Sequence, residues 1–307
     1  MNGRRRSVSS AVVIMALAAL LLPACSTEPE KSLFQEKQDS AAKPSKEQFL
    51  KDGQSALDAE AFGAARDNYM HVLALDPQDA EAKIGLGEAF LGLHQSDDAL
   101  VAFDSVVSDK NFEARALQGK GIAWLMQQKP NDAALSLIQA TKLDPSLWRS
   151  WNALGQLYDS RDDWNQARQS YEAALKVNPR SEIVQNNLGV SLLMQGKYQE
   201  ALPHFSEALK IRPDFGMAKM NLRLVLAWQG KYTEAKAGVA REELPMVLNN
   251  IGYVAILRGD YDVADAYLNQ AIAASPSYFT QAQRNLQYLE SIRAGNSDLA
   301  QPGKLVQ

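Results

Sequence analysis

The side chains best placed for chemistry are asparagines that recur in the second half of the chain. Asn187, Asn221 and Asn250 follow one another at intervals of 34 and 29 residues, and Asn186 and Asn249 stand directly before two of them. A side-chain amide has both a donor and an acceptor, so it can pair with the N–H and the C=O of a peptide together. Asparagines one structural repeat apart would therefore hold an extended peptide with little demand on its sequence.

Apolar residues accompany this asparagine row. Val190, Leu224 and Tyr253 each follow one of the asparagines by three residues and could accept apolar side chains of such a peptide. A second interpretation also stays open, in which the amides bond one another between repeats or face water. Both interpretations need a scaffold that repeats the same face along the chain.

The composition favours a binding protein over an enzyme. The net charge of the 307 residues is −4, which gives no sign of nucleic-acid binding. No metal-spaced cluster, phosphate loop, nucleophile motif or other catalytic constellation stands out. We therefore expect no catalytic residue, no metal and no cofactor.

The N-terminus has the features of an export signal. Arg4, Arg5 and Arg6 precede an apolar run over residues 11–22, which is too short to span a bilayer. The next residues, Leu22-Pro23-Ala24-Cys25-Ser26, resemble a bacterial lipobox. That resemblance implies cleavage of a signal peptide 1–24 and lipid attachment at Cys25, the single cysteine. An ordinary secretory signal with an incidental cysteine is the alternative.

Residues 25–45 continue the N-terminal segment as a flexible linker. The stretch after Cys25 is rich in Ser, Lys, Glu and Gln and has few large apolar residues. Such a composition cannot bury enough surface to fold. We expect this linker to tether the following domain to the membrane through the lipid on Cys25, because two or three acyl chains anchor a protein stably.

Small and large residues recur on a 34-residue grid in the rest of the chain. The segment 148–181 resembles a complete tetratricopeptide repeat (TPR), with all eight marker residues: Trp151, Leu154, Gly155, Tyr158, Ala167, Tyr171, Ala174 and Pro179. Four helix-stopping prolines follow the same grid at Pro77, Pro145, Pro179 and Pro213. The resemblance implies an all-α, right-handed superhelical solenoid of helix-turn-helix units.

We expect about seven units in a TPR domain over residues 46–293, followed by a disordered tail 294–307. The sixth unit has 29 residues instead of 34, so its second helix should be short. Residues 279–293 have helical periodicity and should form a C-terminal capping helix, as solenoids require. The expected units are 46–79, 80–113, 114–147, 148–181, 182–215, the irregular 216–244, and 245–278.

The TPR resemblance places the asparagine row on the first helix of each unit, on the concave face. There it resembles the asparagine ladder in the TPR domain of O-GlcNAc transferase. A charged clamp for a terminal carboxylate would need Lys and Arg at the equivalent positions of successive repeats, and Arg149 is the one such residue in units four to seven. Binding along the peptide backbone is therefore favoured over capture of a terminal carboxylate.

Within this family the C-terminal half resembles the TadD-like lipoprotein of the Tad (tight adherence, Flp) pilus assembly system. The resemblance rests on Asn186–Leu192, on Asn221–Gly230, and on Glu243-Leu244-Pro245 followed by Asn249–Tyr253. It implies a non-enzymatic scaffold, lipid-anchored on the periplasmic face of the outer membrane, that helps the outer-membrane secretin to assemble or localise. Its partner would be the secretin or another pilus assembly component.

Two other functions remain open. One is a type IV pilus pilotin-type lipoprotein, a family that is usually shorter with about six regular repeats. The other is an envelope adaptor for proteases or peptidoglycan hydrolases.

Overall fold

The computed structural model describes residues 44–274 and 279–295, and over these residues every regular element is an α-helix. The predicted all-helical class is confirmed. The signal peptide, Cys25, most of the linker and the tail after residue 295 lie outside the described residues. Among the described helices, none combines the length and the apolar composition needed to cross a bilayer.

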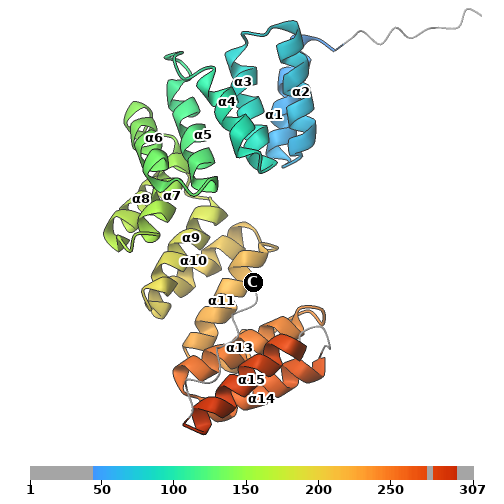
Figure 1. Ribbon diagram of the computed structural model, residues 1–307, viewed down its shortest axis with the longest axis vertical. Coiled ribbons are helices and arrows are strands. Elements are labelled where there is room, and N and C mark those ends of the chain that lie inside the picture. Colours follow the sequence, from blue (N-terminus) through green and yellow to red (C-terminus); the bar gives the residue numbers. More distant parts are fainter. Residues whose placement is uncertain (1–43, 275–278, 296–307) are drawn as a thin grey trace, which may run out of the picture. The chain divides into compact units, whose positions relative to one another are not determined.

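The described helices form seven consecutive pairs followed by a single helix (Figure 1). The second helix of the sixth pair, α12, has 5 residues, as expected from the short sixth unit. The pairs and the final helix are α1 (Lys46–Asp58) with α2 (Phe62–Leu75), α3 (Ala80–Gly92) with α4 (Ser96–Asp104), α5 (Glu113–Met126) with α6 (Pro130–Leu143), α7 (Trp148–Asp159) with α8 (Trp164–Val177), α9 (Glu182–Met194) with α10 (Tyr198–Ile211), α11 (Gly216–Trp228) with α12 (Tyr232–Lys236), α13 (Leu244–Arg258) with α14 (Tyr261–Ala274), and α15 (Phe279–Arg293).

Several helices begin at residues that satisfy the free N–H groups of the first turn. The side chains of Ser45, Asp79 and Ser181 accept hydrogen bonds from the backbone N–H three residues further on. Pro130 and Pro245 stand in the first turns of α6 and α13, where a missing N–H costs nothing. Pro245 therefore belongs to the start of a helix, and α12 has already ended at Lys236.

A left-handed residue joins the two helices of every pair. At the same position of all seven pairs the backbone φ is positive, between 56° and 83°. This conformation costs L-residues other than glycine roughly 1–2 kcal/mol. Glycine occupies the position in the last three pairs, whereas the first four pairs use other residues: Glu60, His94, Gln128 and Asp162.

Within each regular pair, a glycine of the first helix lies against a large side chain of the second. A Cβ added to Gly155 would come within 2.5 Å of the Tyr171 ring, and one added to Gly189 within 2.7 Å of the Phe205 ring. These distances are below any van der Waals contact, so only hydrogen fits there. The same sixteen-residue pairing occurs in four other units: Gly53 with Tyr69, Gly87 with Phe103, Gly121 with Leu137, and Gly252 with Leu268.

The irregular sixth unit departs from this pairing. Arg223 of α11 occupies the position that glycine holds in the other six units, 34 residues after Gly189. The residue sixteen positions later, Val239, lies beyond the end of α12. Because no second helix continues opposite Arg223, a long side chain fits where glycine is required elsewhere.

The pairs stack so that the first helices form one continuous row. Each first helix contacts the next one, from α1 through α3, α5, α7, α9, α11 and α13 to α15. Each second helix instead packs between the first helix of its own pair and that of the following pair. We call the surface shared by these first helices the first-helix face. The arrangement is that of a superhelical solenoid, and the buried core runs along it as a series of clusters between neighbouring pairs.

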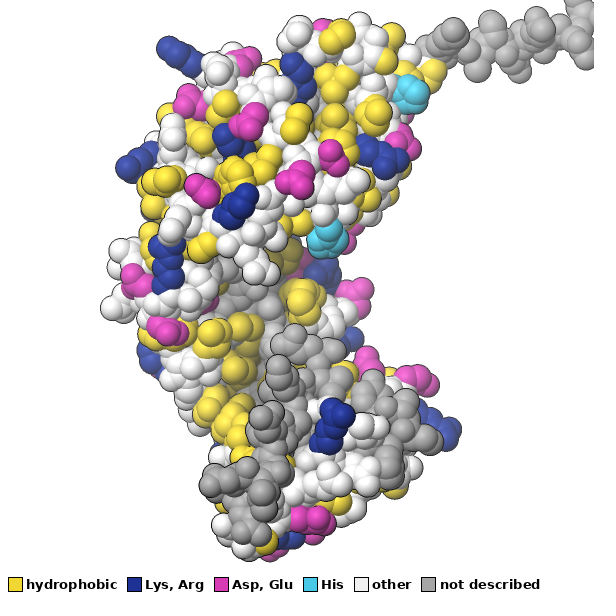
Figure 2. All heavy atoms as spheres, in the orientation of Figure 1, with side chains coloured by type: hydrophobic (Ala, Val, Ile, Leu, Met, Phe, Trp, Pro, Cys, Tyr) yellow, Lys and Arg dark blue, Asp and Glu magenta, His cyan; other side chains and the backbone are white. Residues whose placement is uncertain are grey.

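Charged side chains do not dominate the outside of the solenoid. On the face drawn in Figure 2, acidic and basic side chains alternate with hydrophobic ones over the described residues. This mixed surface agrees with the small net charge of the chain. Recognition of a partner therefore has to come from local features of the first-helix face.

Candidate binding face

The predicted asparagine row lies on three first helices, α9, α11 and α13. The five asparagines differ in their access to solvent. Asn186, Asn249 and Asn250 are buried, with 4%, 0% and 2% of their surfaces exposed. Asn187 and Asn221 are half-buried. A ligand on this face could reach the last two directly.

The amides bond to one another across neighbouring repeats. Asn187 donates to Asn152 of α7 over 3.0 Å. Asn221 donates to Asn186 of α9 over 2.9 Å. Each bond joins residues 35 positions apart, so one asparagine of each first helix reaches the next first helix in the row.

The same pattern closes the C-terminal end. Asn285 of α15 donates to Asn249 of α13 over 2.9 Å, and both side chains are fully buried. Between α11 and α13 the sequence has Met220 in place of the accepting asparagine, and the amide of Asn250 lies 3.6 Å from its sulfur. The interaction with a thioether is weaker, so the network is interrupted at the irregular unit.

These contacts bear directly on the two interpretations of the row. Inter-repeat hydrogen bonding occurs, and it occupies donor or acceptor positions that a peptide would otherwise use. The half-buried Asn187 and Asn221 keep further bonding capacity, because each amide has two donors and two lone pairs. Peptide binding by these residues stays a prediction.

The apolar residues beside the row lie on the same three helices. Val190, Leu224 and Tyr253 are half-buried and leave part of their surfaces on the first-helix face. Val190 and Leu224 pack on the buried cores of their repeats. Burial raises the pKa of Tyr253, whose hydroxyl therefore stays protonated at neutral pH. Their proposed role, like that of the asparagines, stays a prediction.

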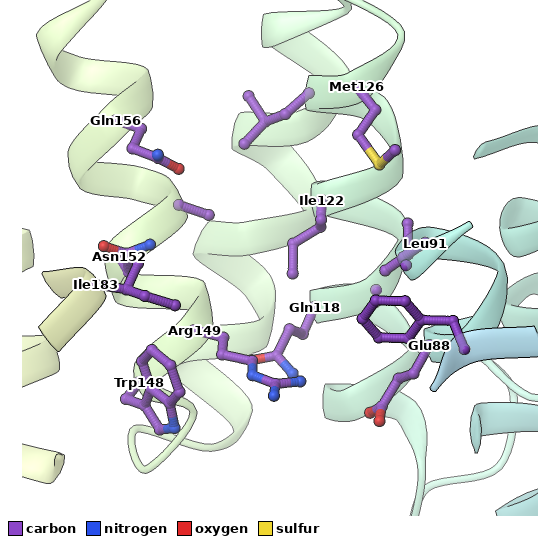
Figure 3. Close-up of a pocket in the computed structure, with 15 residues that line it drawn as sticks. Glu88, Leu91, Gln118, Ile122, Met126, Trp148, Arg149, Asn152, Gln156 and Ile183 are labelled. Carbon is purple, nitrogen blue, oxygen red and sulfur yellow. The ribbon is translucent and has the colours of Figure 1, made fainter. Parts of the chain in front are cut away.

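A pocket of about 440 Å³ opens further along the first-helix face, between α3, α5 and α7 (Figure 3). Its wall is mostly apolar, with Leu91 from α3 and Ile122, Leu125 and Met126 from α5. The polar residues of α7 that line it are Arg149, Asn152 and Gln156. The pocket combines an apolar wall with a few polar groups, as small binding sites in proteins commonly do.

One end of this pocket is charged. Figure 3 shows Gln118 and Arg149 beside each other on the side toward Glu88, with Ile122 and Met126 farther along α5. An adjoining hollow of about 370 Å³ shares Glu88 and Arg149 and adds two more carboxylates, Asp58 and Glu60. Three carboxylates therefore face one guanidinium at this end.

Glu88 is the least solvated of these carboxylates. Its side chain is 21% exposed, and its ion-pair partner, Arg115, lies 3.8 Å away. Arg115 directs its shorter bonds, 2.8 and 2.9 Å, to the two oxygens of Glu81. Burial raises the pKa of Glu88, because removal from water disfavours the ionised form and the two arginines offset only part of this cost.

The pocket was not predicted from the sequence. Arg149 was noted only as an isolated cation, and Glu88 carried no signal, because a single carboxylate on a helix is usually solvated. Gly92 and Gly119 also line the pocket, where a side chain would fill space. Two glycines at matching places on neighbouring first helices are the one sequence signal that could have indicated a hollow there.

Metal binding has no support in the described part of the chain. No three His, Cys, Asp or Glu side chains among those residues gather closely enough to hold a metal ion. The candidate site therefore consists of the first-helix face, with the pocket toward the N-terminal end and the asparagine row toward the C-terminal end.

Family models of the tetratricopeptide repeat match most of the helical region. The matched segments are residues 56–121, 152–214, 192–241 and 247–278. Together they reach every helix pair of the solenoid in whole or in part. The repeat resemblance that the sequence suggested is thus supported by comparison with known repeats.

Curated relatives match over short segments of much longer proteins. Superkiller complex protein 3 of Mus musculus is 29% identical over 119 residues, which is 38% of this chain and 8% of that protein. A probable UDP-N-acetylglucosamine–peptide N-acetylglucosaminyltransferase SPINDLY of Petunia hybrida is 35% identical over 82 residues, 27% of this chain and 9% of that protein. The chain spans less than a tenth of the length of these two relatives, so the matches concern repeats alone.

Solved structures give the same fold at low identity. A TPR protein of Thermus thermophilus aligns with a TM-score of 0.52 and 19% identity, covering 62% of this chain and 98% of that chain. The Cut9–Hcn1 hetero-tetramer of the APC/C aligns with a TM-score of 0.58 and 15% identity, covering 84% of this chain and 52% of that chain. At these identities the likeness establishes the fold alone.

Proposed function

Because the chain belongs to the tetratricopeptide repeat family, we propose that it is a non-enzymatic scaffold that binds a protein or peptide on its first-helix face. The observation that carries this proposal is the pocket between α3, α5 and α7, which opens on the row of first helices and has an apolar wall. An apolar hollow with a few polar groups suits the side chains of an extended segment.

The apolar character of the face continues toward the C-terminus. Ile183, Met194 and Met217, all on first helices, have 38%, 54% and 60% of their surfaces exposed. Methionine side chains adapt their shape to different partners and recur on surfaces that bind proteins. These residues support a protein partner over a small polar molecule.

We further propose that the scaffold is lipid-anchored at Cys25 on the periplasmic face of the outer membrane. The support is the sequence Leu22-Pro23-Ala24-Cys25-Ser26 and the apolar run before it. Its role there would be to assist assembly or localisation of the secretin in Tad/Flp pilus biogenesis. The support for this finer assignment is the resemblance of the segments around Asn186, Asn221 and Asn249 to the TadD-like lipoproteins.

Affinity capture from native membranes tests the scaffold role. The full chain carries a C-terminal tag, and the test variant combines Ile122→Gln with Met126→Gln in the pocket wall. Leu135→Gln is the matched control, because Leu135 lies on the second helix α6 and is 72% exposed. We expect the secretin or another pilus component to be captured by the wild type and the control and lost by the pocket variant.

Two further results would change the proposal. Capture of a protease or peptidoglycan hydrolase in place of the secretin would replace the pilus role by that of an envelope adaptor. Equal capture by all three forms would remove the pocket from the binding surface. A parallel capture with Asn187→Ala and Asn221→Ala tests the asparagine row on the same partner.

Lipid attachment is tested separately, by metabolic labelling with a palmitate analogue. The wild type should incorporate label and sediment with the outer membrane. Cys25→Ala should lose both properties while its helical circular-dichroism signal stays unchanged. An unlabelled wild type would leave an ordinary secretory signal as the interpretation of the N-terminus.

A further inference from the structure

The charged end of the α3–α5–α7 pocket has an excess of acid next to an apolar wall. Asp58, Glu60 and Glu88 line the adjoining hollow together with one cation, Arg149, which gives an excess of two negative charges. Arg149 lies over the ring of the preceding Trp148 at 5.6 Å and forms no ion pair with any described residue. Its charge is thus held toward the α7 side of the pocket.

Glu88 stands where the apolar and the charged parts meet. It lines both hollows, whereas Asp58 and Glu60 line the outer one alone. Its carboxylate receives no hydrogen bond from any described residue, and its 3.8 Å contact with Arg115 is long because that arginine is engaged with Glu81. A mostly buried carboxylate without a close donor is an incomplete electrostatic site.

A cationic side chain would complete this site. An ammonium or guanidinium group of a ligand can donate charge-assisted hydrogen bonds to Glu88, which is partly desolvated and therefore interacts strongly. Asp58 and Glu60 at the rim would attract the same cation as it approaches. An apolar residue next to the cationic one would reach the wall formed by Ile122, Leu125 and Met126.

We propose that this pocket binds an extended partner segment in which a lysine or arginine stands beside a large apolar residue, with the cation at Glu88 and the apolar side chain against Ile122 and Met126. The inference rests on the proposed peptide-binding function and adds the chemical class of the segment. Charge complementarity at the acidic end argues for this occupant over an acidic or a purely apolar segment.

Selection from a random dodecapeptide library displayed on phage tests the proposal with the full chain as bait. We expect enriched peptides to carry Lys or Arg directly beside Leu, Met or Phe. The best peptide and its analogues with Gln or Glu in place of the basic residue are then titrated. The basic peptide should bind at least tenfold more tightly than the Gln analogue, and the Glu analogue should bind least.

Two variants of the chain assign the preference to the pocket. Glu88→Gln should lower the affinity for the basic peptide about tenfold and leave the affinity for the Gln analogue unchanged. Glu290→Gln, on the exposed face of α15, makes the same chemical change far along the chain and should alter neither value. Thermal melts of both variants check that each is folded.

The outcomes separate this inference from the function on which it rests. Peptides that bind equally well with Lys, Gln or Glu would overturn the cation site and leave the scaffold function standing. A preference for Lys that persists in Glu88→Gln would also overturn it, since another group would then hold the cation. If no peptide is enriched, the inference fails, and capture of a folded partner protein decides the proposed function independently.

Discussion

The carboxylate of Asp159 in α7 accepts a hydrogen bond of 2.6 Å from the hydroxyl of Ser191 in α9. Its second oxygen accepts a hydrogen bond of 2.8 Å from Tyr171 in α8. A charged group only 8% exposed thus joins the complete fourth repeat to the fifth. Burial raises the pKa of Asp159, and the two hydroxyl donors offset part of this effect.

This burial predicts a pH-dependent cost in stability. Because the native pKa of Asp159 lies above its unfolded value, the native state holds the proton more tightly, and its contribution to stability falls as pH rises from the unfolded pKa through the native one. Asp159→Asn should therefore gain stability relative to the wild type as the pH is raised from the acid range to neutrality. Urea unfolding at several pH values measures this difference.

Asp98→Asn is the control for the loss of one charge, because Asp98 is exposed on α4. A pH trend in Asp159→Asn no larger than that of the control would contradict the prediction. It would mean that Ser191 and Tyr171 compensate the carboxylate fully.

The left-handed turn residues offer a stabilising substitution. Gln128 has φ of 57° between α5 and α6, where glycine would avoid the steric cost of an L-residue. Gln128→Gly should raise the free energy of unfolding by roughly 0.5–1 kcal/mol, because glycine's own entropic cost offsets part of the gain. Chemical denaturation at constant pH measures the change.

The reverse substitution serves as the comparison. Gly196 has φ of 71° at the equivalent turn, and an added Cβ would meet only the Tyr198 hydroxyl, at 4.0 Å. Gly196→Ala should therefore lower stability by roughly 1 kcal/mol through backbone strain alone. Two changes of the same sign would show that the turn conformation is not the controlling factor.

The close contact between Gly155 and Tyr171 predicts a large effect for a small substitution. Gly155→Ala would bring a methyl group within 2.5 Å of the ring, so the two helices must separate or the tyrosine must shift. A loss of about 1–3 kcal/mol is expected from overpacking. In contrast, Gly63→Ala in α2 has no neighbour within 4 Å and should stabilise that helix slightly. Thermal unfolding of the two variants checks the contrast, and equal melting temperatures would refute it.

The bond between Asn249 and Asn285 predicts energetic coupling between α13 and the final helix. Either single change to alanine leaves a buried amide unpaired and should cost about 1–3 kcal/mol. The double variant should cost less than the sum, with a coupling of about 0.5–1.5 kcal/mol. A double-mutant cycle in urea measures this coupling.

An exposed asparagine gives the baseline for that cycle. Asn269 on α14 bonds only within its own helix, to Asp265, and Asn269→Ala should change stability by less than about 0.5 kcal/mol. Strict additivity of Asn249→Ala and Asn285→Ala would show that the amide bond contributes nothing to the docking of α15.

Much of the fold could be predicted because the repeat is local. Gly155 and Tyr171 are sixteen residues apart on two adjacent helices, so their contact follows from the helical period and a short turn. The same reasoning identified the short sixth unit, since five missing residues between Asn221 and Asn250 had to shorten one helix. Where Arg223 breaks the pattern, the sequence showed the departure, but the reason for it became visible only with Val239 beyond the end of α12.

The candidate site was predicted less completely. The asparagines were placed on the right helices, yet the sequence left open whether their amides face a ligand or one another. The partners Asn152 and Asn285 were not singled out, because neither continues the spacing of the row. Contacts between residues about 35 apart depend on how two neighbouring pairs cross, and the spacing alone does not give that angle.

By itself the sequence determined the helical repeat, the irregular unit and the expectation of a lipid anchor, because each depends on neighbours in the chain or on composition. The tertiary structure decided which amides pair, that Asp159 is buried, and that Glu88 faces an apolar pocket. Burial and charge contact depend on side chains brought together from different repeats, and small shifts in the stacking of helices change these distances by more than a hydrogen bond tolerates.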